Sequence, residues 1–251
     1  MNDKIAGKFR GTGVKAGIMY GMAEFYGGGA FVIINTFFLV FLTKALGMPA
    51  ALAGAIPMVG KVWDAITDPM MGNITDRTSS RFGPKRLYIL IGGILSAIAF
   101  VSLWTTIPSR STTVQFIYYI VMYCLFSTCF TIIMVPYNGL LPDMVDSYDI
   151  RSKFSSLRMI WSTVGAILAG LVPTLMIKDT LNTSMYLKVA IIFGILFGFA
   201  AVVTFIGTWE KIKPPVKTKL RDSFSEASSV FKSRSFKIFI GIYLSGQCAM
   251  D

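Results

Sequence analysis

The sequence predicts an all-α protein that crosses a membrane several times, and three observations support this fold class. Hydrophobic residues make up 54% of the 251 residues and charged residues only 15%, whereas about a quarter of a soluble domain is charged. The apolar residues gather in stretches close to or above the roughly 20 residues that a helix needs to cross a bilayer. These stretches are continuous, whereas strands of membrane barrels alternate with a period of two. The composition therefore excludes a water-soluble enzyme, a disordered chain and a secreted disulfide scaffold.

Six stretches are apolar enough to span a bilayer, and a seventh is incomplete. The six cover residues 16–46, 50–75, 87–107, 114–137, 157–177 and 187–209. The seventh begins near Phe236 and reaches the end of the sequence after about 16 residues, which is short for a span. We therefore expect a basic N-terminal arm, a six-helix transmembrane bundle, a linker and an incomplete seventh transmembrane helix, over residues 1–15, 16–209, 210–235 and 236–251.

The distribution of charge predicts how these helices are oriented. Most of the 24 lysines and arginines lie in the N-terminal arm and after the second, fourth and sixth stretches. Because cytoplasmic loops carry an excess of Lys and Arg, we expect a multi-pass protein of the cell (inner) membrane with a cytoplasmic N-terminus. The net charge of +11 suits contact with anionic headgroups of the lipid bilayer. We expect no nucleic acid as a partner.

The linker contains an apolar face at helical spacing. Leu220, Phe224, Ala227 and Phe231 recur three or four residues apart, which predicts a short amphipathic helix. Two interpretations stay open: the helix lies on the membrane surface, or it packs on the other loops as a soluble linker helix.

Three ionisable side chains lie within the second stretch. Lys61, Asp64 and Asp68, in the string KVWDAITDP, are spaced so that they share one helical face. Charges inside a span are expensive, so this face must point to an internal cavity rather than to lipid. Two carboxylates one turn apart supply the hard oxygen ligands that a small dehydrated cation requires, and the same pair can instead share a proton. We therefore predict a cation site at Asp64 and Asp68, with Na⁺ as the metal if coupling is to sodium.

Glu24 in the first stretch is a further candidate for this site, because its depth from the predicted cytoplasmic end is similar to that of Asp68. The competing interpretation is structural: Lys61 is the charge partner of Asp64, as buried charges usually pair. Three acids against one lysine leave a surplus negative charge, which a bound cation would balance.

Acid–base segments follow the second and fourth stretches. The first has the pattern G-x-x-x-D-R-x-x-x-R-x-G and begins at Gly72. Charge pairs across the cytoplasmic mouth would hold one conformation and break in the other. The residues that we expect to form this gate are Asp76, Arg77, Arg81, Asp149 and Arg151. The alternative for the first segment is an ordinary basic loop with turn residues.

Several residues near these spans are candidates for binding a solute. They are Arg158, Asn138, Tyr137, Gly27, Gly28 and Trp63. The guanidinium of Arg158 either reaches the central cavity or extends to the membrane interface. Tyr137 and Asn138 lie in PYNGLLP, where prolines can break a helix and expose them to a polar solute. The alternative is that the glycines and prolines only pack and end helices.

Three strings of the chain resemble a known family of transporters. They are YGMAEF, KVWDAITDPMMGNITDRTSSRFGPKR and VPYNGLLPDMVDSYDIRSKFSSLRM, and they are similar to the glycoside–pentoside–hexuronide:cation symporters, the melibiose-carrier branch of the major facilitator superfamily. The resemblance runs from about Tyr20 through Arg158, and more loosely to the chain end. It implies a fold of two six-helix halves, of which this chain forms the N-terminal bundle of 3+3 repeats plus part of helix 7.

The resemblance also implies a function and a set of roles. It implies uptake of a sugar, glycoside or uronide by alternating access, driven by Na⁺, H⁺ or Li⁺ and without another cofactor. It implies that Asp64 and Asp68 are the paired cation ligands, and that Arg158 lies near the sugar pocket.

The sugar side of the family pattern is altered. Gly27 and Gly28 stand where the melibiose carriers have a Lys–Asp pair, and Met134 and Asn138 stand where they have Asp and Trp. A pocket that has lost an acid and keeps Arg158 suits uronides, and other glycosides or a noncarbohydrate solute stay open.

The first hypothesis is therefore a cation-coupled symporter of a small carbohydrate-like solute, present as an N-terminal half that needs its missing C-terminal half or a partner subunit. The second is a half-length nontransporting membrane protein that assembles with or regulates a full-length transporter. In a third, the acidic pair is only structural in a general facilitator. We expect no enzyme, because histidine is absent and no nucleophile–base pair or cofactor fingerprint is present.

Overall fold

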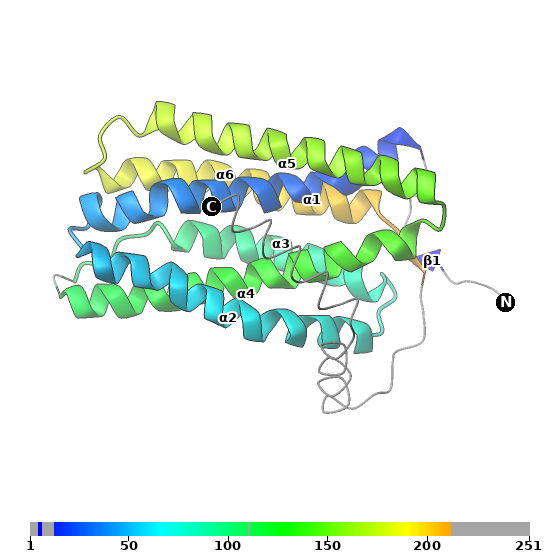
Figure 1. Ribbon diagram of the computed structural model, residues 1–251, viewed down its shortest axis with the longest axis horizontal. Helices are drawn as coiled ribbons and strands as arrows, with labels where there is room; N and C mark the ends of the chain where they lie inside the picture. The colour runs from blue at the N-terminus through cyan, green and yellow to red at the C-terminus, as the bar shows by residue number, and fades with distance from the viewer. Residues whose placement is uncertain (1–4, 7–12, 110, 212–251) are drawn as a thin grey trace, which may run out of the picture. The chain divides into compact units, whose positions relative to one another are not determined.

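The computed structural model describes residues 5–6, 13–109 and 111–211. These residues form six long helices and a two-residue strand pair, which confirms the all-α fold (Figure 1). The helices are α1 (Val14–Ile33), α2 (Ala50–Arg77), α3 (Pro84–Ser102), α4 (Thr112–Met144), α5 (Tyr148–Met176) and α6 (Thr183–Gly207). α1 continues as the π-helical turns η1 (Ile34–Phe38) and η2 (Phe41–Ala45), and β1 (Ile5–Ala6) pairs antiparallel with β2 (Glu210–Lys211). The predicted linker helix and seventh helix lie outside the described residues, as does most of the basic arm.

Each of the six predicted spans falls on one of these helices, and α4 and α5 differ most from prediction. α4 runs through Pro136 and Pro142 without interruption, so the interpretation in which these prolines break the helix is wrong. A proline removes one N–H donor and crowds the carbonyl four residues earlier, but the buried neighbours Tyr137 and Leu140 hold this turn against the rest of the bundle. α5 begins at Tyr148, nine residues before the predicted apolar stretch at 157–177. Its first turns are polar, so hydropathy alone does not reveal them.

Five of the helical segments are long and apolar enough to cross a membrane, which supports a multi-pass membrane protein. They are Val14–Ala45, Pro84–Ser102, Thr112–Met144, Tyr148–Met176 and Thr183–Gly207. α2 has 28 residues and packs beside α4 in the same bundle. Its charged residues Lys61, Asp64 and Asp68 lower its apolar content, so its length and its neighbours, rather than its hydropathy, place it with the other five.

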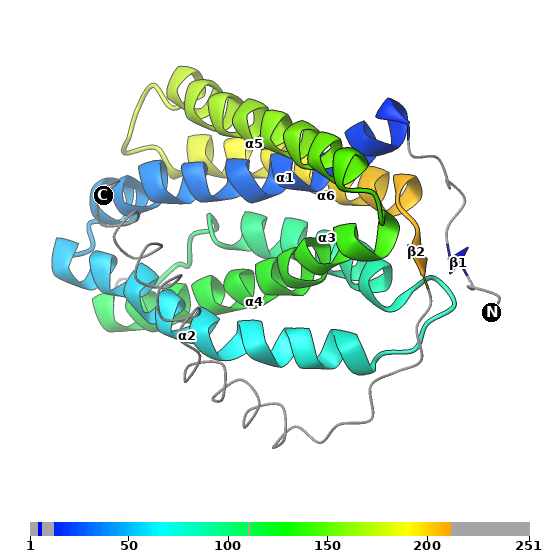
Figure 2. The ribbon, with the colours of Figure 1, turned by 45° about the vertical axis from the view of Figure 1, so that its right-hand side comes forward.

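The helices lie lengthwise beside one another, and most neighbours in space are distant in sequence (Figure 1). α1 packs on α5 and α6, α4 packs on α2 and α3, and α3 also packs on α6 (Figure 2). The α1–α5 contact is close, because a Cβ atom at Gly28 would lie 2.6 Å from the carbonyl oxygen of Ser162. Small residues allow membrane helices to approach in this way. The pairs α1–α5 and α2–α4 each carry one of the polar clusters described below.

Aromatic side chains fill the core around η1 and η2. Phe38, Phe41, Trp104, Tyr119 and Tyr186 are at most 2% exposed. The rings of Trp104 and Tyr186 stack with centroids 5.9 Å apart. This cluster joins residues of the first helical segment to α4, α6 and the end of α3, and so fixes the helices that carry the polar side chains.

Candidate functional site

Two acidic side chains of α2 face two hydroxyl side chains of α4. The Ser127 hydroxyl donates a hydrogen bond to the Asp64 carboxylate, and Thr131 Oγ1 donates to Asp68 Oδ1 at 2.7 Å. Both pairs are separated by 63 residues in sequence, so one turn of α2 matches one turn of α4. The two helices therefore run parallel and in register. We call these four residues the carboxylate–hydroxyl ladder.

The α2–α4 contact is tight on both sides of Asp64. A Cβ atom at Gly60, one turn earlier, would overlap the ring of Tyr123. The indole N–H of Trp63 donates to Thr128 Oγ1 at 2.8 Å, while the Trp63 side chain stays 41% exposed. Glycine at position 60 thus lets the Asp64 carboxylate reach α4.

The ladder has the chemistry of a site for a hard cation. Asp64 is half-buried and Asp68 is exposed in the described bundle, whereas Ser127 and Thr131 are 6% and 3% exposed. Carboxylate and hydroxyl oxygens are the ligand types that such cations prefer. Across the described part of the chain, no three His, Cys, Asp or Glu side chains gather into a metal site, so the candidate rests on two acids and their hydroxyl neighbours. Sequence reasoning missed Ser127 and Thr131, although their four-residue spacing repeats that of the two aspartates.

Lys61 lies over an aromatic ring of the first helical segment. Its ammonium lies over the ring of Phe31 in the first helical segment, 5.2 Å from the ring centroid, which is a cation–π contact. Asp64 is turned instead toward Ser127 on α4. Within the residues that the structure describes, the contacts of Lys61 and Asp64 therefore do not support the structural interpretation, in which Lys61 is the charge partner of Asp64. The two side chains are close to one turn apart on α2, but they face different neighbouring helices.

Glu24 on α1 forms an ion pair with Arg158 on α5. Arg158 Nη2 also donates to Asn138 Oδ1 on α4 at 2.5 Å, and the guanidinium lies 4.8 Å from the ring centroid of Tyr137. The structure thus favours the interpretation in which Arg158 points toward the other helices rather than to the membrane interface. The structure brings together three residues that are predicted to bind a solute: Arg158, Asn138 and Tyr137. Glu24, which the sequence groups with the aspartates of α2, joins them.

A cavity of about 410 Å³ lies beside this ion pair, within the usual range for small-molecule sites. It is lined by Glu24, Ser155, Arg158, Met159, Ser162 and Thr163. A Cβ atom at Gly27 would lie 2.6 Å from Glu24 Oε2, so Gly27 leaves room for that carboxylate. Gly28 packs directly on Ser162 of α5. Both glycines act by setting the space between helices, which is the packing alternative raised for them above.

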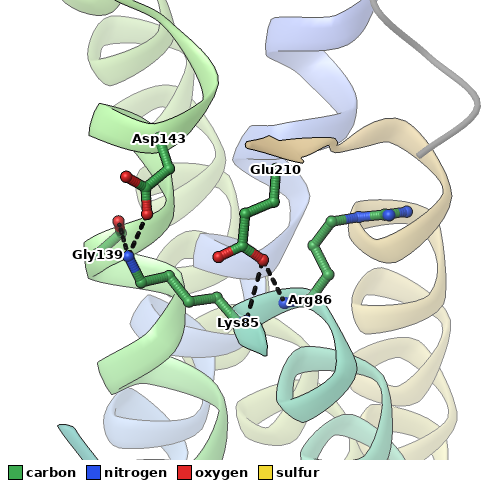
Figure 3. Close-up of polar contacts among 5 residues, drawn as sticks. All are labelled: Lys85, Arg86, Gly139, Asp143 and Glu210. Atoms are coloured by element: carbon green, nitrogen blue, oxygen red, sulfur yellow. Dashed lines mark hydrogen bonds and ion pairs between the residues drawn. The ribbon is translucent and has the colours of Figure 1, made fainter. Parts of the chain in front are cut away.

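Charged side chains also join the ends of three helices, where α3 begins and α4 and α6 end (Figure 3). The Lys85 ammonium pairs with Asp143 and donates to the carbonyl oxygen of Gly139 at 2.9 Å. The carboxylate of Glu210, in β2, accepts the backbone N–H groups of Lys85 at 3.0 Å and Arg86 at 3.4 Å. These contacts tie β2 to the first turn of α3 and tie that turn to α4.

At this end of the bundle, a side chain of β2 caps the start of α3, and a side chain of α3 caps the end of α6. Gly83 offers no capping side chain at the start of α3, and a Cβ atom there would overlap the Glu210 carboxylate, which takes the capping role. Arg86 Nη2 donates in return to the carbonyl oxygen of Phe205 at 2.6 Å, in the last turn of α6. Burial raises the pKa of Glu210 above its ordinary value, against the lowering effect of the N–H groups that it accepts.

The residues predicted to form a gate lie at this same end of the bundle. They are Asp76 and Arg77 at the end of α2, Arg81 in the following loop, and Asp149 and Arg151 in the first turn of α5. The Arg81 guanidinium lies 4.6 Å from the ring centroid of Phe82. Arg151 Nη2 donates to the carbonyl oxygen of Val145 at 3.0 Å. Sequence reasoning missed Glu210, because its partner Lys85 lies 125 positions away and no local spacing connects the two.

Comparison with known proteins adds a family to this geometry. The family of MFS/sugar transport proteins matches residues 19–250. An uncharacterized symporter of Synechocystis is 37% identical over 61% of this chain and 29% of its own length. An inner membrane symporter of Escherichia coli is 28% identical over 85% of this chain and 47% of its own. The isoprimeverose transporter of Lactiplantibacillus pentosus is 24% identical over 80% of this chain and 44% of its own. The chain thus spans less than half the length of each of these relatives.

Proposed function

The chain belongs to the family of MFS/sugar transport proteins, and from this premise we propose that it serves cation-coupled symport of a glycoside-like solute by alternating access. Because the chain spans less than half of its relatives' length, the proposed activity is that of a whole transporter to which this six-helix bundle contributes. In such transporters the solute and the coupling ion bind near the middle of the membrane, at the interface between repeats. The basic loops favour a cytoplasmic position for the N-terminus.

The carboxylate–hydroxyl ladder carries this proposal. Asp64 and Asp68 lie one turn apart on a helix of a membrane bundle, where an ionised side chain is expensive unless a partner balances it. Lys61 lies over Phe31 instead, and we propose that a bound Na⁺ or H⁺ balances the charge of the aspartates. The ladder hydroxyls, Ser127 and Thr131, hold the two carboxylates in position toward α4.

The solute belongs, in this proposal, to the cavity beside Arg158. Arg158 and Asn138 offer donors and acceptors to hydroxyl groups, and the guanidinium of Arg158 packs on the ring of Tyr137. Trp63, 41% exposed and one residue from Asp64, does not line this cavity, so we assign it no contact with the solute there. The relatives' names support this choice of solute, since one of them is an isoprimeverose transporter.

The experiment is uptake of radiolabelled glycosides and pentosides, isoprimeverose included, into proteoliposomes that contain the protein at its natural length. Accumulation is measured under an imposed Na⁺ gradient, an imposed pH gradient, or neither. We expect one gradient to drive accumulation, and we expect Asp64→Asn and Asp68→Asn to abolish the gradient dependence. Asp179→Asn is the matched control, because Asp179 is exposed in the α5–α6 loop and its side-chain oxygen accepts only a nearby backbone N–H.

Gradient-driven accumulation that survives in both aspartate variants would refute the ladder as the coupling site. Uptake that follows the solute gradient alone, in the unsubstituted protein, would instead identify a facilitator.

A further inference from the structure

The charge of Arg158 is already balanced within the protein. Its guanidinium forms an ion pair with Glu24, and the two side chains are 26% and 11% exposed. The same guanidinium donates to Asn138 and rests on the ring of Tyr137. An arginine that binds a carboxylate of a solute normally offers its two parallel N–H groups to that carboxylate. Here Oε1 of Glu24 lies against one such edge, formed by Nε and Nη2, and Nη2 also donates to Asn138.

The cavity wall is accordingly neutral overall and rich in hydroxyl groups. Among its lining residues, Arg158 is the cation and Glu24 is the acid, and three others carry hydroxyls: Ser155, Ser162 and Thr163. A hydroxyl both donates and accepts hydrogen bonds, which matches the hydroxyl groups of a sugar. Met159 supplies an apolar surface for the carbon face of a ring.

A negatively charged solute would meet an unfavourable field in this cavity. Its carboxylate would approach the Glu24 carboxylate, and a like charge in a partly desolvated site is repelled. To bind the Nε–Nη2 edge of Arg158 it would also have to displace Glu24, leaving a mostly buried acid without its partner. The expectation from sequence that an arginine-containing pocket suits uronides therefore changes once Glu24 is placed beside Arg158.

We propose that Glu24 is a specificity-determining residue that neutralises Arg158 and so restricts the cavity to uncharged polyhydroxylated solutes, excluding uronides and other organic anions. This inference rests on the proposed function, since it assigns the solute class of the same transporter. Glu24 acts here on the choice of solute and not as a ligand of the coupling ion. Gly27 contributes indirectly, because its missing side chain leaves space for the Glu24 carboxylate.

The test compares solutes that differ only in charge. Binding of matched methyl glycoside and methyl glycuronide pairs, in the gluco and galacto series, is measured by isothermal titration calorimetry on the protein at its natural length. We expect the unsubstituted protein to bind the neutral member at least roughly tenfold more tightly, equivalent to about 1.4 kcal/mol. Glu24→Gln keeps the size of the side chain and removes its charge, and we expect it to reverse this preference.

Glu24→Asp is the second variant, since it keeps the charge and should keep the preference for the neutral member. Equal thermal stability of the three proteins would show that the change in preference does not come from misfolding. An unsubstituted protein that binds the glycuronides as well as the glycosides, or a Glu24→Gln variant with unchanged preference, would overturn the inference.

Failure of the proposed function has a different signature. In that case no member of either series would bind in a way that depends on the cation, and Asp64→Asn would change nothing. A charge preference that reverses in Glu24→Gln while cation dependence is absent would support the inference about Glu24 and refute only the coupling.

Discussion

The Glu210 carboxylate caps the first turn of α3 by accepting the backbone N–H of Lys85 at 3.0 Å, across 125 positions of sequence. Helix N-termini usually receive this bond from a residue directly before the helix. Here that residue is Gly83, which leaves room for a carboxylate from β2. The cap therefore joins two segments of the chain as well as ending a helix.

Removing the cap should destabilise the bundle. Glu210→Ala leaves two backbone N–H groups of α3 without their acceptor, and we expect a loss of about 1–2 kcal/mol in the free energy of unfolding. Thermal unfolding in detergent, followed by circular dichroism, measures this loss. Glu210→Gln retains an acceptor oxygen and serves as the control. An alanine variant as stable as the unsubstituted protein would show that water replaces the carboxylate without cost.

The raised pKa of Glu210 makes a separate prediction about pH. Burial favours the neutral form in the folded protein, so the folded state holds its proton to a higher pH than the unfolded state does. The contribution of this group to stability is therefore full below the ordinary pKa of a glutamate and falls as the pH rises through the raised value. We expect Glu210→Gln to lack this decline. If the free energy of unfolding changed with pH in the same way for the unsubstituted protein and for Glu210→Gln across the acidic range, the prediction would be contradicted.

Gly60 should be intolerant of side chains. A Cβ atom there would overlap the ring of Tyr123, so Gly60→Ala must push α2 away from α4 at a cost of about 1–3 kcal/mol. The shift would also separate Asp64 from Ser127, and we expect cation-dependent uptake to fall together with thermal stability. Adding Tyr123→Leu should restore both, because it removes the overlapping atoms. Gly54→Ala is the control, since a Cβ atom there meets nothing within 4 Å.

The Ser127 hydroxyl should affect the apparent affinity for the coupling cation. Ser127→Ala removes the hydrogen bond that holds the Asp64 carboxylate toward α4, worth about 1 kcal/mol and hence roughly fivefold in half-saturating cation concentration. Solute uptake at varied cation concentration measures it. Ser102→Ala, which loses only a bond to the Ile98 carbonyl of its own helix, should be neutral. Equal half-saturation in both variants would remove Ser127 from the site.

Five of the six long helices in the described part of the chain could be predicted from sequence because hydropathy reports directly on the environment of each segment. The uninterrupted course of α4 could not be predicted, because a proline at position 136 disfavours a helix locally. Only the packing of Tyr137 and its neighbours overrides this local preference. The face shared by Asp64 and Asp68 followed from helical spacing alone. The partners of these acids depend on how helices are rotated against one another, which spacing within one helix does not encode.

Lys61 and Glu24 illustrate that limit. Both were placed with the aspartates of α2 by depth and spacing, yet Lys61 faces Phe31 and Glu24 faces Arg158. A pattern shared by two helices is more informative about which side chains become partners. The four-residue interval between Ser127 and Thr131 repeats that between the aspartates, and such matched intervals indicate that two helix faces can meet, while the parallel direction follows only from which residues pair.

The constant offset of 63 residues between α2 and α4 restricts how this helix pair can move. A shift by part of a turn would break both carboxylate–hydroxyl bonds at once. A shift by one whole turn, about 5.4 Å, would carry Asp64 to Thr131 but leave Asp68 beside Val135, which offers no donor. The opposite shift would carry Asp68 to Ser127 and Asp64 to Tyr123, so only the observed register pairs both carboxylates with Ser127 and Thr131. We therefore expect α2 and α4 to keep their relative position, so that conformational changes of the bundle take place at other helix contacts.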